Sequence, residues 1–491
     1  MKRSSVDVAV IGGGGAGLVA AAGTAALGAG TVLIERNRLG GECTWTGCVP
    51  SKALLHIARQ VANIEKSRQL GVQIDEPQID FSAVMDSVRS TRRRIFEDSE
   101  TPERLKNLGI RPLHASARFL DRQTLRIERN GRQREFTFRS AIIATGSRPF
   151  IPDIPGLDTV DFLTNETLFG IDRLPERLAI LGGGAVGVEM AQAFSRLGSR
   201  VSLICHDDQL ISEFDPAASS VLGNVLAAEG VDVFLRSTIG SVRRTEHSLD
   251  AEIIGDGNPW RLGMDGLLIA TGRVPNTGSL DLDAAGISHD RNGITVDRHC
   301  RTNIRHILAS GDVTPAPNQT HVGENMSKAA AINAVARLPI WKHESEVIPR
   351  VIYTDPEIAM VGRSTRDLND SGARFDTIDF PIDRIDRAVT EHDTTGFIRV
   401  HHRFGKVLGA TIVGPRAGEM IVEYAIAMKH GLSLADLSTT VHPYPTMMLG
   451  ARRAADQIFF RALKPWMVRG VQLLYGYNGD LPDYIGTRTN V

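Results

Sequence analysis

The fold of this chain is decided by residues 6–36, which read VDVAVIGGGGAGLVAAAGTAALGAGTVLIER. The apolar run over 6–11 predicts a buried parallel strand. The small residues of 18–29 predict a helix that packs closely on a sheet, and 31–35 predict a second strand. The stretch therefore indicates a strand–turn–helix–strand unit with a glycine-rich turn.

The glycines of that turn have a functional spacing. Gly12, Gly14 and Gly17 give the pattern G-x-G-x-x-G, and the second strand ends on Glu35. The backbone must turn sharply here and approach a pyrophosphate at the helix N-terminus, while the acid accepts a hydrogen bond from a ribose hydroxyl. With strand, helix and acid in place, the pattern predicts a dinucleotide-binding site.

The same pattern recurs 170 residues later. Residues 177–206 read RLAILGGGAVGVEMAQAFSRLGSRVSLICH, in which Gly182, Gly184 and Gly187 repeat the spacing. Two such sites in one chain indicate two redox cofactors, or one cofactor and one reductant.

Three short apolar strands return the chain to these sheets. Two of them end in ATG, at Gly146 and at Gly272, and the third ends in ASGD, at Asp312. From about 347 the texture changes to strand-like and helical segments without a phosphate loop. We therefore expect an α/β protein with two Rossmann-like domains and a C-terminal α+β domain.

Composition limits the class of protein. With 491 residues the chain is long enough for several domains, and a formal net charge of −1 favours neither nucleic acid nor an acidic membrane. The uncharged run over 8–34 resembles a membrane span, but five of residues 12–17 are glycine, which suits a phosphate loop better. We expect a cytoplasmic protein without stable membrane insertion.

Cys43 and Cys48 are the only two of the four cysteines that lie close in sequence. A zinc site would need further Cys or His ligands nearby, and a structural staple would be reduced in the cytosol. A redox pair fits better, provided that both residues lie on a turn or a distorted helix start, which Gly47 helps to form. Pro50 suits the first turn of a following helix, whose positive end lowers a thiol pKa, and Lys52 adds a charge.

The stretch GGECTWTGCVPSK, residues 40–52, resembles the motif G-G-x-C-x4-C-x-P-S-K of the FAD-dependent pyridine nucleotide–disulfide oxidoreductases. That family includes glutathione reductase, dihydrolipoamide dehydrogenase and mercuric reductase. The resemblance covers nearly the whole chain. It implies an FAD-binding domain over 1–150 and 278–346, an NAD(P)-binding domain over 151–277 and a dimerisation domain over 347–465. We expect an irregular tail over 466–491.

The resemblance also implies roles for the FAD site. Gly12, Gly14 and Gly17 would hold the pyrophosphate and Glu35 the adenosine ribose. Asp312 matches the acid at the ribityl chain. Two further positions complete the implied FAD contacts, namely Ala117 and Gly146.

In the second site the same resemblance places a nicotinamide cofactor at Gly182, Gly184 and Gly187, with Gly272 at the end of a strand beside it. Lys52 and Glu189 match a pair beside the flavin. The acid typical of NAD-linked members is replaced by Cys205, so we expect NADPH with His206 near the 2′-phosphate, and NADH as the alternative. Asp207 and Asp208 oppose a phosphate there.

The cysteines take two roles in the implied reaction. Cys48 matches the thiol that lies against the flavin, and Cys43 matches the outer thiol that attacks the substrate. Electrons would run from the nicotinamide through FAD to the disulfide and on to an acceptor.

The C-terminal motif departs from the family. Disulfide-reducing members have H-P-T-x-x-E, whereas residues 441–450 read VHPYPTMMLG, with Tyr444 in the histidine position and Leu449 in the glutamate position. Mercuric reductases also have tyrosine there, but they keep the acid and a C-terminal cysteine pair that this chain lacks. His442 shares a face with Tyr444 in an extended segment and is a candidate substitute, with a packed or exposed histidine as the alternative. Tyr444 is either a weak acid or a packing residue.

We therefore expect a homodimeric flavoenzyme that uses NAD(P)H to reduce a thiol-reactive acceptor. The acceptor classes are a small disulfide, a soft metal ion such as Hg(II), or another electrophile. One alternative is a diaphorase that reduces quinones directly from the flavin. The other is a binding or sensing flavoprotein without turnover.

Overall fold

The structure is a computed structural model that describes residues 4–481, and the chain divides into two compact units. The first unit comprises Met1–His206 and Arg236–Ser345, and the second comprises Asp207–Leu235 and Glu346–Val491. The segment 207–235 lies within the expected NAD(P)-binding domain in sequence, yet it groups with the C-terminal residues.

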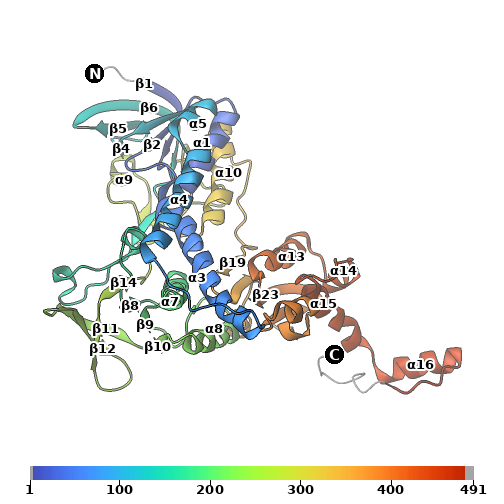
Figure 1. Ribbon diagram of the computed structural model, residues 1–491. Helices are drawn as coiled ribbons and strands as arrows, with labels where there is room; N and C mark the ends of the chain where they lie inside the picture. The colour runs from blue at the N-terminus through green and yellow to red at the C-terminus, as the bar shows by residue number, and fades with distance from the viewer. Residues whose placement is uncertain (1–3, 482–491) are drawn as a thin grey trace. The chain divides into compact units, whose positions relative to one another are not determined.

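The N-terminal sheet of the first unit contains seven strands (Figure 1). Its parallel part has the order β3-β2-β1-β6 with β18 beside β6, and β5 and β4 continue from β6 in antiparallel fashion. The strands are β1 (Ser4–Ile11), β2 (Thr31–Glu35), β3 (Ile110–His114), β4 (Ser116–Phe119), β5 (Thr124–Arg129), β6 (Arg132–Ile143) and β18 (Ile307–Ala309). The apolar run predicted as a buried strand is therefore the central strand β1.

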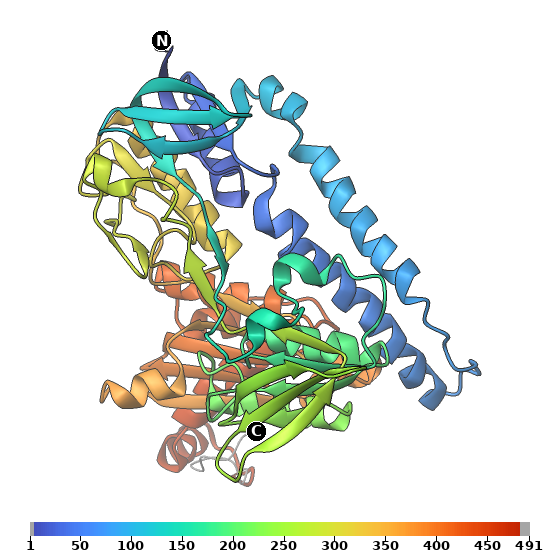
Figure 2. The ribbon, with the colours of Figure 1, turned by 90° about the vertical axis from the view of Figure 1, so that its left-hand side faces the viewer.

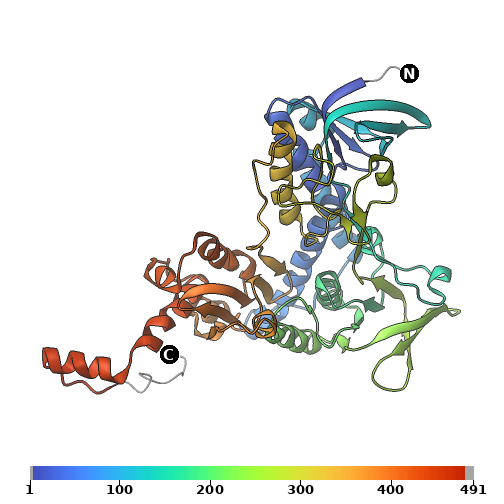
Figure 3. The ribbon, with the colours of Figure 1, turned by 180° about the vertical axis from the view of Figure 1, so that it is seen from behind.

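Two helices on this sheet pack at close range. Helix α1 (Gly15–Ala26) contacts α10 (Thr320–Ala336), as Figure 3 also shows. A Cβ at Gly23 would lie 2.8 Å from the Cβ of Ala331, so only glycine allows this approach. The small residues of α1 thus bring the start of α10 close to the glycine-rich turn.

A pair of long helices follows the second strand of the chain. After the short α2 (Gly41–Trp45), helices α3 (Cys48–Gln69) and α4 (Phe81–Ser99) pack side by side (Figure 2). Asp80 caps α4 by accepting a hydrogen bond from the Ala83 amide.

The second glycine-rich segment contributes the parallel strands β9, β8 and β14, which are neighbours in that order within one sheet. It consists of β8 (Arg177–Leu181), α7 (Ala185–Arg196), β9 (Arg200–Ile204) and β14 (Gly266–Ile269). An antiparallel meander of β11 (Thr238–Arg244), β12 (Leu249–Ile254) and β13 (Trp260–Met264) belongs to the same unit, as do the paired strands β7 (Ser147–Pro149) and β15 (Arg273–Pro275).

The C-terminal unit is built on an antiparallel sheet with the order β19-β20-β23-β22-β21. Its strands are β19 (Arg350–Ile352), β20 (Glu357–Gly362), β21 (Asp376–Pro381), β22 (Phe397–Arg403) and β23 (Lys406–Gly414). Its main helices are α8 (Pro216–Ala228), α13 (Ala417–His430), α14 (Leu434–Thr439) and α15 (Leu449–Ala462). The core includes Ile398, Ile412 and Tyr424, each fully buried.

The remaining short elements connect these parts. They are α5 (Pro102–Asn107), α6 (Asn165–Leu168), β10 (Asp232–Phe234), α9 (Leu282–Ala285), β16 (His289–Asp290), β17 (Gly293–Ile294), α11 (Thr365–Asp370), α12 (Asp386–Glu391) and the 3₁₀ turns Leu157–Thr159 and Ile382–Arg384.

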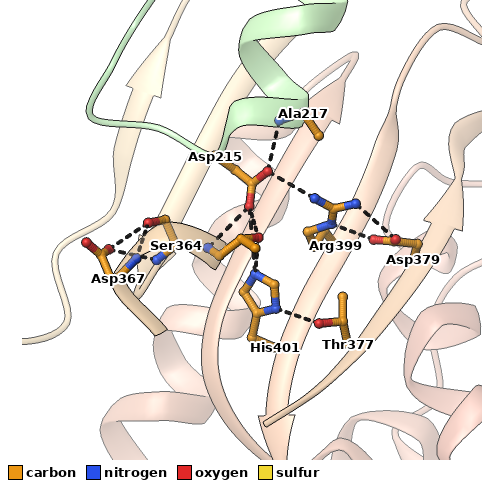
Figure 4. Close-up of polar contacts among 9 residues, drawn as sticks. Asp215, Ala217, Ser364, Asp367, Thr377, Asp379, Arg399 and His401 are labelled. Atoms are coloured by element: carbon orange, nitrogen blue, oxygen red, sulfur yellow. Dashed lines mark hydrogen bonds and ion pairs between the residues drawn. The ribbon is translucent and has the colours of Figure 1, made fainter. Parts of the chain in front are cut away.

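Helix α8 is attached to the C-terminal sheet through a buried carboxylate (Figure 4). Asp215, at the N-cap of α8, accepts hydrogen bonds from the Ala217 amide at 3.0 Å and from the Arg399 guanidinium at 3.0 Å. The Thr365 hydroxyl also donates to it, and His401 Nε2 lies 3.7 Å away. The segment 207–235 is therefore held in its unit by charge as well as by apolar packing.

The architecture confirms the expected α/β class with two dinucleotide-binding folds and a C-terminal α+β domain. The irregular tail expected over 466–491 needs a correction, because helix α16 spans Pro465–Tyr475. Pro465 suits a first helical position, and the Val, Met, Gln and Leu residues that follow are compatible with a helix. Residues 482–491 lie outside the described part of the chain.

None of the helices within residues 4–481 has both the length and the apolar character that crossing a membrane requires.

Candidate active site

The two glycine-rich turns have the same geometry. Gly12 has a φ of +107° and Gly182 a φ of +124°, and a Cβ on either would lie 2.2 Å from a carbonyl oxygen of a neighbouring strand end. A Cβ at Gly17 or Gly187 would lie 1.8 Å from the carbonyl oxygen of the first glycine. Any side chain at these positions would displace backbone, so the sequence pattern is required by the turn itself.

Both helices after these turns begin in the same way. Gly14 and Gly184 are the N-caps of α1 and α7, and neither first turn contains an acidic residue. A Cβ at Gly184 would meet nothing within 4 Å, and one at Gly14 only Gly41 Cα at 3.7 Å. Amide groups at a helix start with open space in front of them suit an anionic phosphate group.

The carboxylate of Glu35 lies beside the first turn. It accepts hydrogen bonds from the amides of Gly13 and Asn37, each at 2.6 Å. This fixes the orientation of the side chain at the carboxyl end of β2, where a ribose hydroxyl would be recognised.

The two cysteines lie at the junction of α2 and α3. Cys43 is in the short helix α2 and is partly buried, and Cys48 is the exposed first residue of α3, with Gly47 as its N-cap. The expected distorted helix start between them is therefore present. Both are thiols here and interact by a hydrogen bond between their side chains.

The two thiols have opposite acidities. The hydrogen bond with Cys43 lowers the pKa of Cys48 to about 6, against the loss of hydration around its sulfur. Thr320 and Lys52 lower this pKa further. The same hydrogen bond and burial raise the pKa of Cys43 far above its usual range. The pair therefore holds one proton on Cys43 and a thiolate on Cys48 near neutral pH.

Lys52 and Glu189 form an ion pair next to this site. Lys52 Nζ lies 2.9 Å from Glu189 Oε2 and 3.2 Å from Oε1. Lys52 is one turn along α3 from Cys48, while Glu189, on α7, is 4% exposed. The sequence-predicted pair is thus brought together from helices 137 residues apart.

The residues around Cys43 are each attached to a different element. The Thr44 hydroxyl donates to Glu100 at 2.9 Å. The Trp45 indole donates to the Leu39 carbonyl at 2.7 Å, and the guanidinium groups of Arg38 and Arg92 lie 5.3 Å and 6.0 Å from the centre of its ring. Helix α2 is thereby fixed against the end of α4.

Glu42 belongs to a polar chain that the sequence did not predict. It pairs with Arg273 and accepts a hydrogen bond from the Asn165 amide at 2.9 Å. Arg273 Nε donates to the Ser147 hydroxyl at 2.7 Å, which donates to Asp312 at 2.9 Å. Burial raises the pKa of Glu42 to about 7, although Arg273 opposes it.

The remaining predicted positions are placed as follows. Ala117 lies on β4 opposite Ile127, and His206 is exposed two residues after the end of β9. Gly146 has a φ of +65°, and Gly272 one of +121°. A Cβ on either glycine would meet no atom within 4 Å among the described residues. Both glycines therefore leave room beside the ends of strands.

In the C-terminal unit His442 is buried in a pair. Its Nε2 lies 3.0 Å from Glu423 Oε1, and its Nδ1 lies 2.9 Å from the Thr440 carbonyl oxygen. Burial raises the pKa of Glu423, and His442 opposes this shift. Both ring nitrogens are occupied, which favours the packed reading of His442 over the acid–base reading.

The two motif positions next to it differ in exposure. Tyr444 is 70% exposed, whereas Leu449 is 5% exposed and begins α15. The position that carries an acid in H-P-T-x-x-E is here part of the core.

Comparisons with known proteins assign the family. The model described as pyridine nucleotide-disulphide oxidoreductase matches residues 6–327, and the model of its dimerisation domain matches residues 348–454. The chain is 33% identical to a mercuric reductase from Shigella flexneri over 464 residues, covering 93% of this chain and 81% of that protein. It is 31% identical to a dihydrolipoyl dehydrogenase from Geobacillus stearothermophilus over 458 residues, which cover 92% of this chain and 95% of that protein.

A solved structure is also similar. The HOCl-induced flavoprotein disulfide reductase RclA from Escherichia coli superposes with a TM-score of 0.80 at 26% identity, covering 92% of this chain and 98% of that one. This chain belongs to the pyridine nucleotide-disulphide oxidoreductase family. Its class uses FAD and a pyridine nucleotide, and the dimerisation domain supports a homodimer.

The residues present fit FAD at the first turn. The start of α1 has no side-chain cap. Glu35 ends β2, and Asp312 follows β18 of the same sheet by three residues. Gln319, the N-cap of α10, has a buried Oε1 atom with no hydrogen-bond partner among the described residues. An orphaned buried acceptor beside a glycine-lined turn is consistent with a polar cofactor.

Proposed function

We propose that this chain is an NAD(P)H-dependent flavoenzyme that reduces a thiol-reactive acceptor through the Cys43–Cys48 disulfide. The observation that carries the proposal is the thiol pair with opposite acidities beside the Lys52–Glu189 ion pair. FAD bound here would supply the two-electron chemistry that connects a nicotinamide to the disulfide.

The chain's own residues divide the work. Cys48 remains a thiolate after reduction, while Cys43 carries the proton. Before the Cys43 sulfur attacks the acceptor, this proton has to pass to the Cys48 thiolate or to solvent. Lys52, held by Glu189, keeps a positive charge one helical turn from Cys48. Gly12, Gly14, Gly17, Glu35, Ala117, Gly146 and Asp312 would hold FAD.

For the coenzyme we propose NADPH, with NADH as the alternative. Gly182, Gly184, Gly187 and Gly272 would form the site. Cys205 is buried and offers no carboxylate to a ribose 2′-OH, whereas His206 is exposed where a 2′-phosphate would lie. Comparing apparent KM values for the two nucleotides would decide between them.

The acceptor is proposed by class. A soft metal ion such as Hg(II) is favoured by the similarity to mercuric reductases and by tyrosine at position 444; a small disulfide or another electrophile are the other classes. We further propose that the enzyme works as a cytoplasmic homodimer in which Tyr444 reaches the partner's site.

An anaerobic titration of the purified flavoprotein with NADPH, then NADH, tests the proposal. A long-wavelength charge-transfer band after one equivalent is expected, because the Cys48 thiolate would lie against the oxidised flavin. Simple bleaching of the flavin would overturn the disulfide route.

A diaphorase that reduces quinones from the flavin is a second candidate. It is favoured by Leu449 in the core and by the buried pair of His442, since neither leaves an evident proton donor for thiols. The variant Cys43→Ser separates the two, because a diaphorase would keep its quinone reduction and the disulfide enzyme would lose its reduction of thiol-reactive acceptors.

A further inference from the structure

Thr320 contacts the Cys48 sulfur although 272 residues separate them in sequence. The Thr320 hydroxyl lies 3.2 Å from Cys48 Sγ, within hydrogen-bond distance for sulfur. Thr320 is the first residue of α10, and Cys48 is the first residue of α3. The sulfur therefore lies where two helix N-termini meet.

The direction of this hydrogen bond depends on the charge of the sulfur. A thiolate can only accept, so the hydroxyl must donate to it, and hydrogen bonds to ionised acceptors are about twice as strong as neutral ones. The bond therefore favours the charged sulfur over the neutral thiol or the disulfide. Thr320 acts in the same direction as Lys52, but by direct contact.

The side chain of Thr320 is held in place from its other branch. A Cβ built at Gly15 would lie 3.5 Å from the Thr320 γ-methyl group, an ordinary van der Waals distance, so this methyl points towards the start of α1. Because β-branched side chains have few rotamers, packing one branch fixes the other.

The helix that carries Thr320 is itself fixed. The close contact between Gly23 and Ala331 seats α10 against α1. The hydroxyl is thus positioned by backbone packing rather than by a mobile loop.

We propose that Thr320 is a positioning residue of the dithiol, whose hydroxyl donates a hydrogen bond to the Cys48 thiolate and so favours the reduced pair. The inference rests on the proposed function. In the reduction, two electrons from NAD(P)H break the S–S bond, one proton goes to Cys43, and Cys48 keeps a negative charge. Stabilising that charge shifts the disulfide–dithiol equilibrium towards the dithiol.

Two variants of the FAD-loaded enzyme test this. Thr320→Val replaces the hydroxyl by a methyl group of similar size, and Thr320→Ser keeps the hydroxyl. Equilibration of the Cys43–Cys48 pair in dithiothreitol redox buffers gives its reduction equilibrium without turnover. We expect the valine variant to reduce the equilibrium constant about tenfold, which is about 30 mV for two electrons. The equilibrium constant of the serine variant should stay within about twofold of that of the unmodified protein.

The rate of Cys48 alkylation by iodoacetamide at pH 7 gives a second measure, and it should fall in the valine variant only. Thr91→Val is the matched control, because the Thr91 hydroxyl donates to the Ser87 carbonyl within α4 of the same unit. An unchanged equilibrium in Thr320→Val, or a loss that serine does not restore, would overturn the inference. If the unmodified pair forms no disulfide at all, the proposed function fails instead.

Discussion

At the scale of single residues, the site is defined by how one proton is shared between two sulfur atoms. The order of acidity follows from position. Cys48 begins a helix and faces Lys52 and Thr320, whereas Cys43 is partly buried and donates to its neighbour. Neither cysteine is unusual alone, and the asymmetry exists only in the pair.

The first prediction concerns that pair. In Cys43→Ala the largest cause of the lowered pKa is removed, so the pKa of Cys48 should rise from about 6 towards the ordinary value near 9. Alkylation of Cys48 as a function of pH, followed by mass spectrometry on the reduced protein, measures the midpoint. A midpoint that stayed near pH 6 would assign the lowered pKa to Thr320, Lys52 and the helix end without Cys43.

A second prediction concerns Glu42, next to Cys43. Because burial raises its pKa to about 7, the folded protein binds this proton more tightly than the unfolded chain does. Its contribution to stability is present below pH about 4.5 and is lost as the pH rises through about 7. The Glu42→Gln variant should not show this loss. At pH 8 its free energy of unfolding should exceed that of the unmodified protein by about 1–2 kcal/mol, a value reduced for solvent screening because the Glu42 side chain is 34% exposed.

Thermal unfolding midpoints at a fixed FAD concentration, measured from pH 4 to pH 8, check the Glu42 prediction. When the midpoint is plotted against pH, the two proteins should give the same values near pH 4 and increasingly different values towards pH 8. Parallel curves would mean that Glu42 does not titrate differently in the folded state.

At the scale of elements, short helix α2 is the part that the sequence left undefined. Its residues between the cysteines are attached to α4 and to the preceding loop through Thr44 and Trp45. These contacts hold Cys43 near Cys48 without a bond between the sulfur atoms.

We therefore expect Trp45→Ala to destabilise the protein by about 1–3 kcal/mol, through lost packing and two lost cation–π contacts. It should also slow closure of the Cys43–Cys48 disulfide by oxidised glutathione. Denaturant unfolding and the rate of disulfide closure are the two measurements. Trp341→Ala is the control, because that ring is 56% exposed, and equal effects of the two substitutions would contradict the role of Trp45.

At the scale of the whole molecule, contacts between distant parts of the sequence decide which segments form one unit. Asp215 is contacted by Thr365, which lies 150 positions further along the chain, and by Arg399, which lies 184 positions further. Burial alone would raise its pKa, but hydrogen bonds from His401 and Thr365, with the Arg399 charge, lower that pKa well below its usual range. The segment 207–235 thus depends on a charge for its place in the C-terminal unit.

Asp215→Asn should cost about 3 kcal/mol at pH 7, because Arg399 loses a fully buried charged partner. The lowered pKa means that the stabilisation by Asp215 is present above pH about 4 and is lost at more acidic pH. The free energy of unfolding of the variant should therefore fall less steeply than that of the unmodified protein as the pH is lowered below about 4. Chemical unfolding at pH 7 and pH 3 measures both effects. The control Asp379→Asn, at a side chain 43% exposed, should cost less than about 1 kcal/mol.

Much of this molecule was predictable because its signals are local. The glycine spacings, the strand ends and the cysteine motif each lie within about 30 residues, and they indicated the fold and the redox pair. Three site residues could not be predicted, because nothing in the sequence around them marks them: Thr320, Glu100 and Asn165. Only tertiary packing brings Thr320 to Cys48, Glu100 to Thr44 and Asn165 to Glu42. The helix α16 was missed since its glycine and aromatic residues indicated an irregular tail.

The two glycine turns match in another respect. The amide of Gly12 donates to the Ile34 carbonyl and that of Gly182 to the Ile204 carbonyl, each at 2.8 Å. Such agreement between halves 170 residues apart is what duplication of one ancestral segment would leave behind. Because the shared turn can select neither nucleotide over the other, we propose that selectivity diverged around the end of the second strand, at Glu35 in one copy and at Cys205 and His206 in the other. Exchanging a few residues there is thus a compact route to re-engineering coenzyme preference without disturbing either fold.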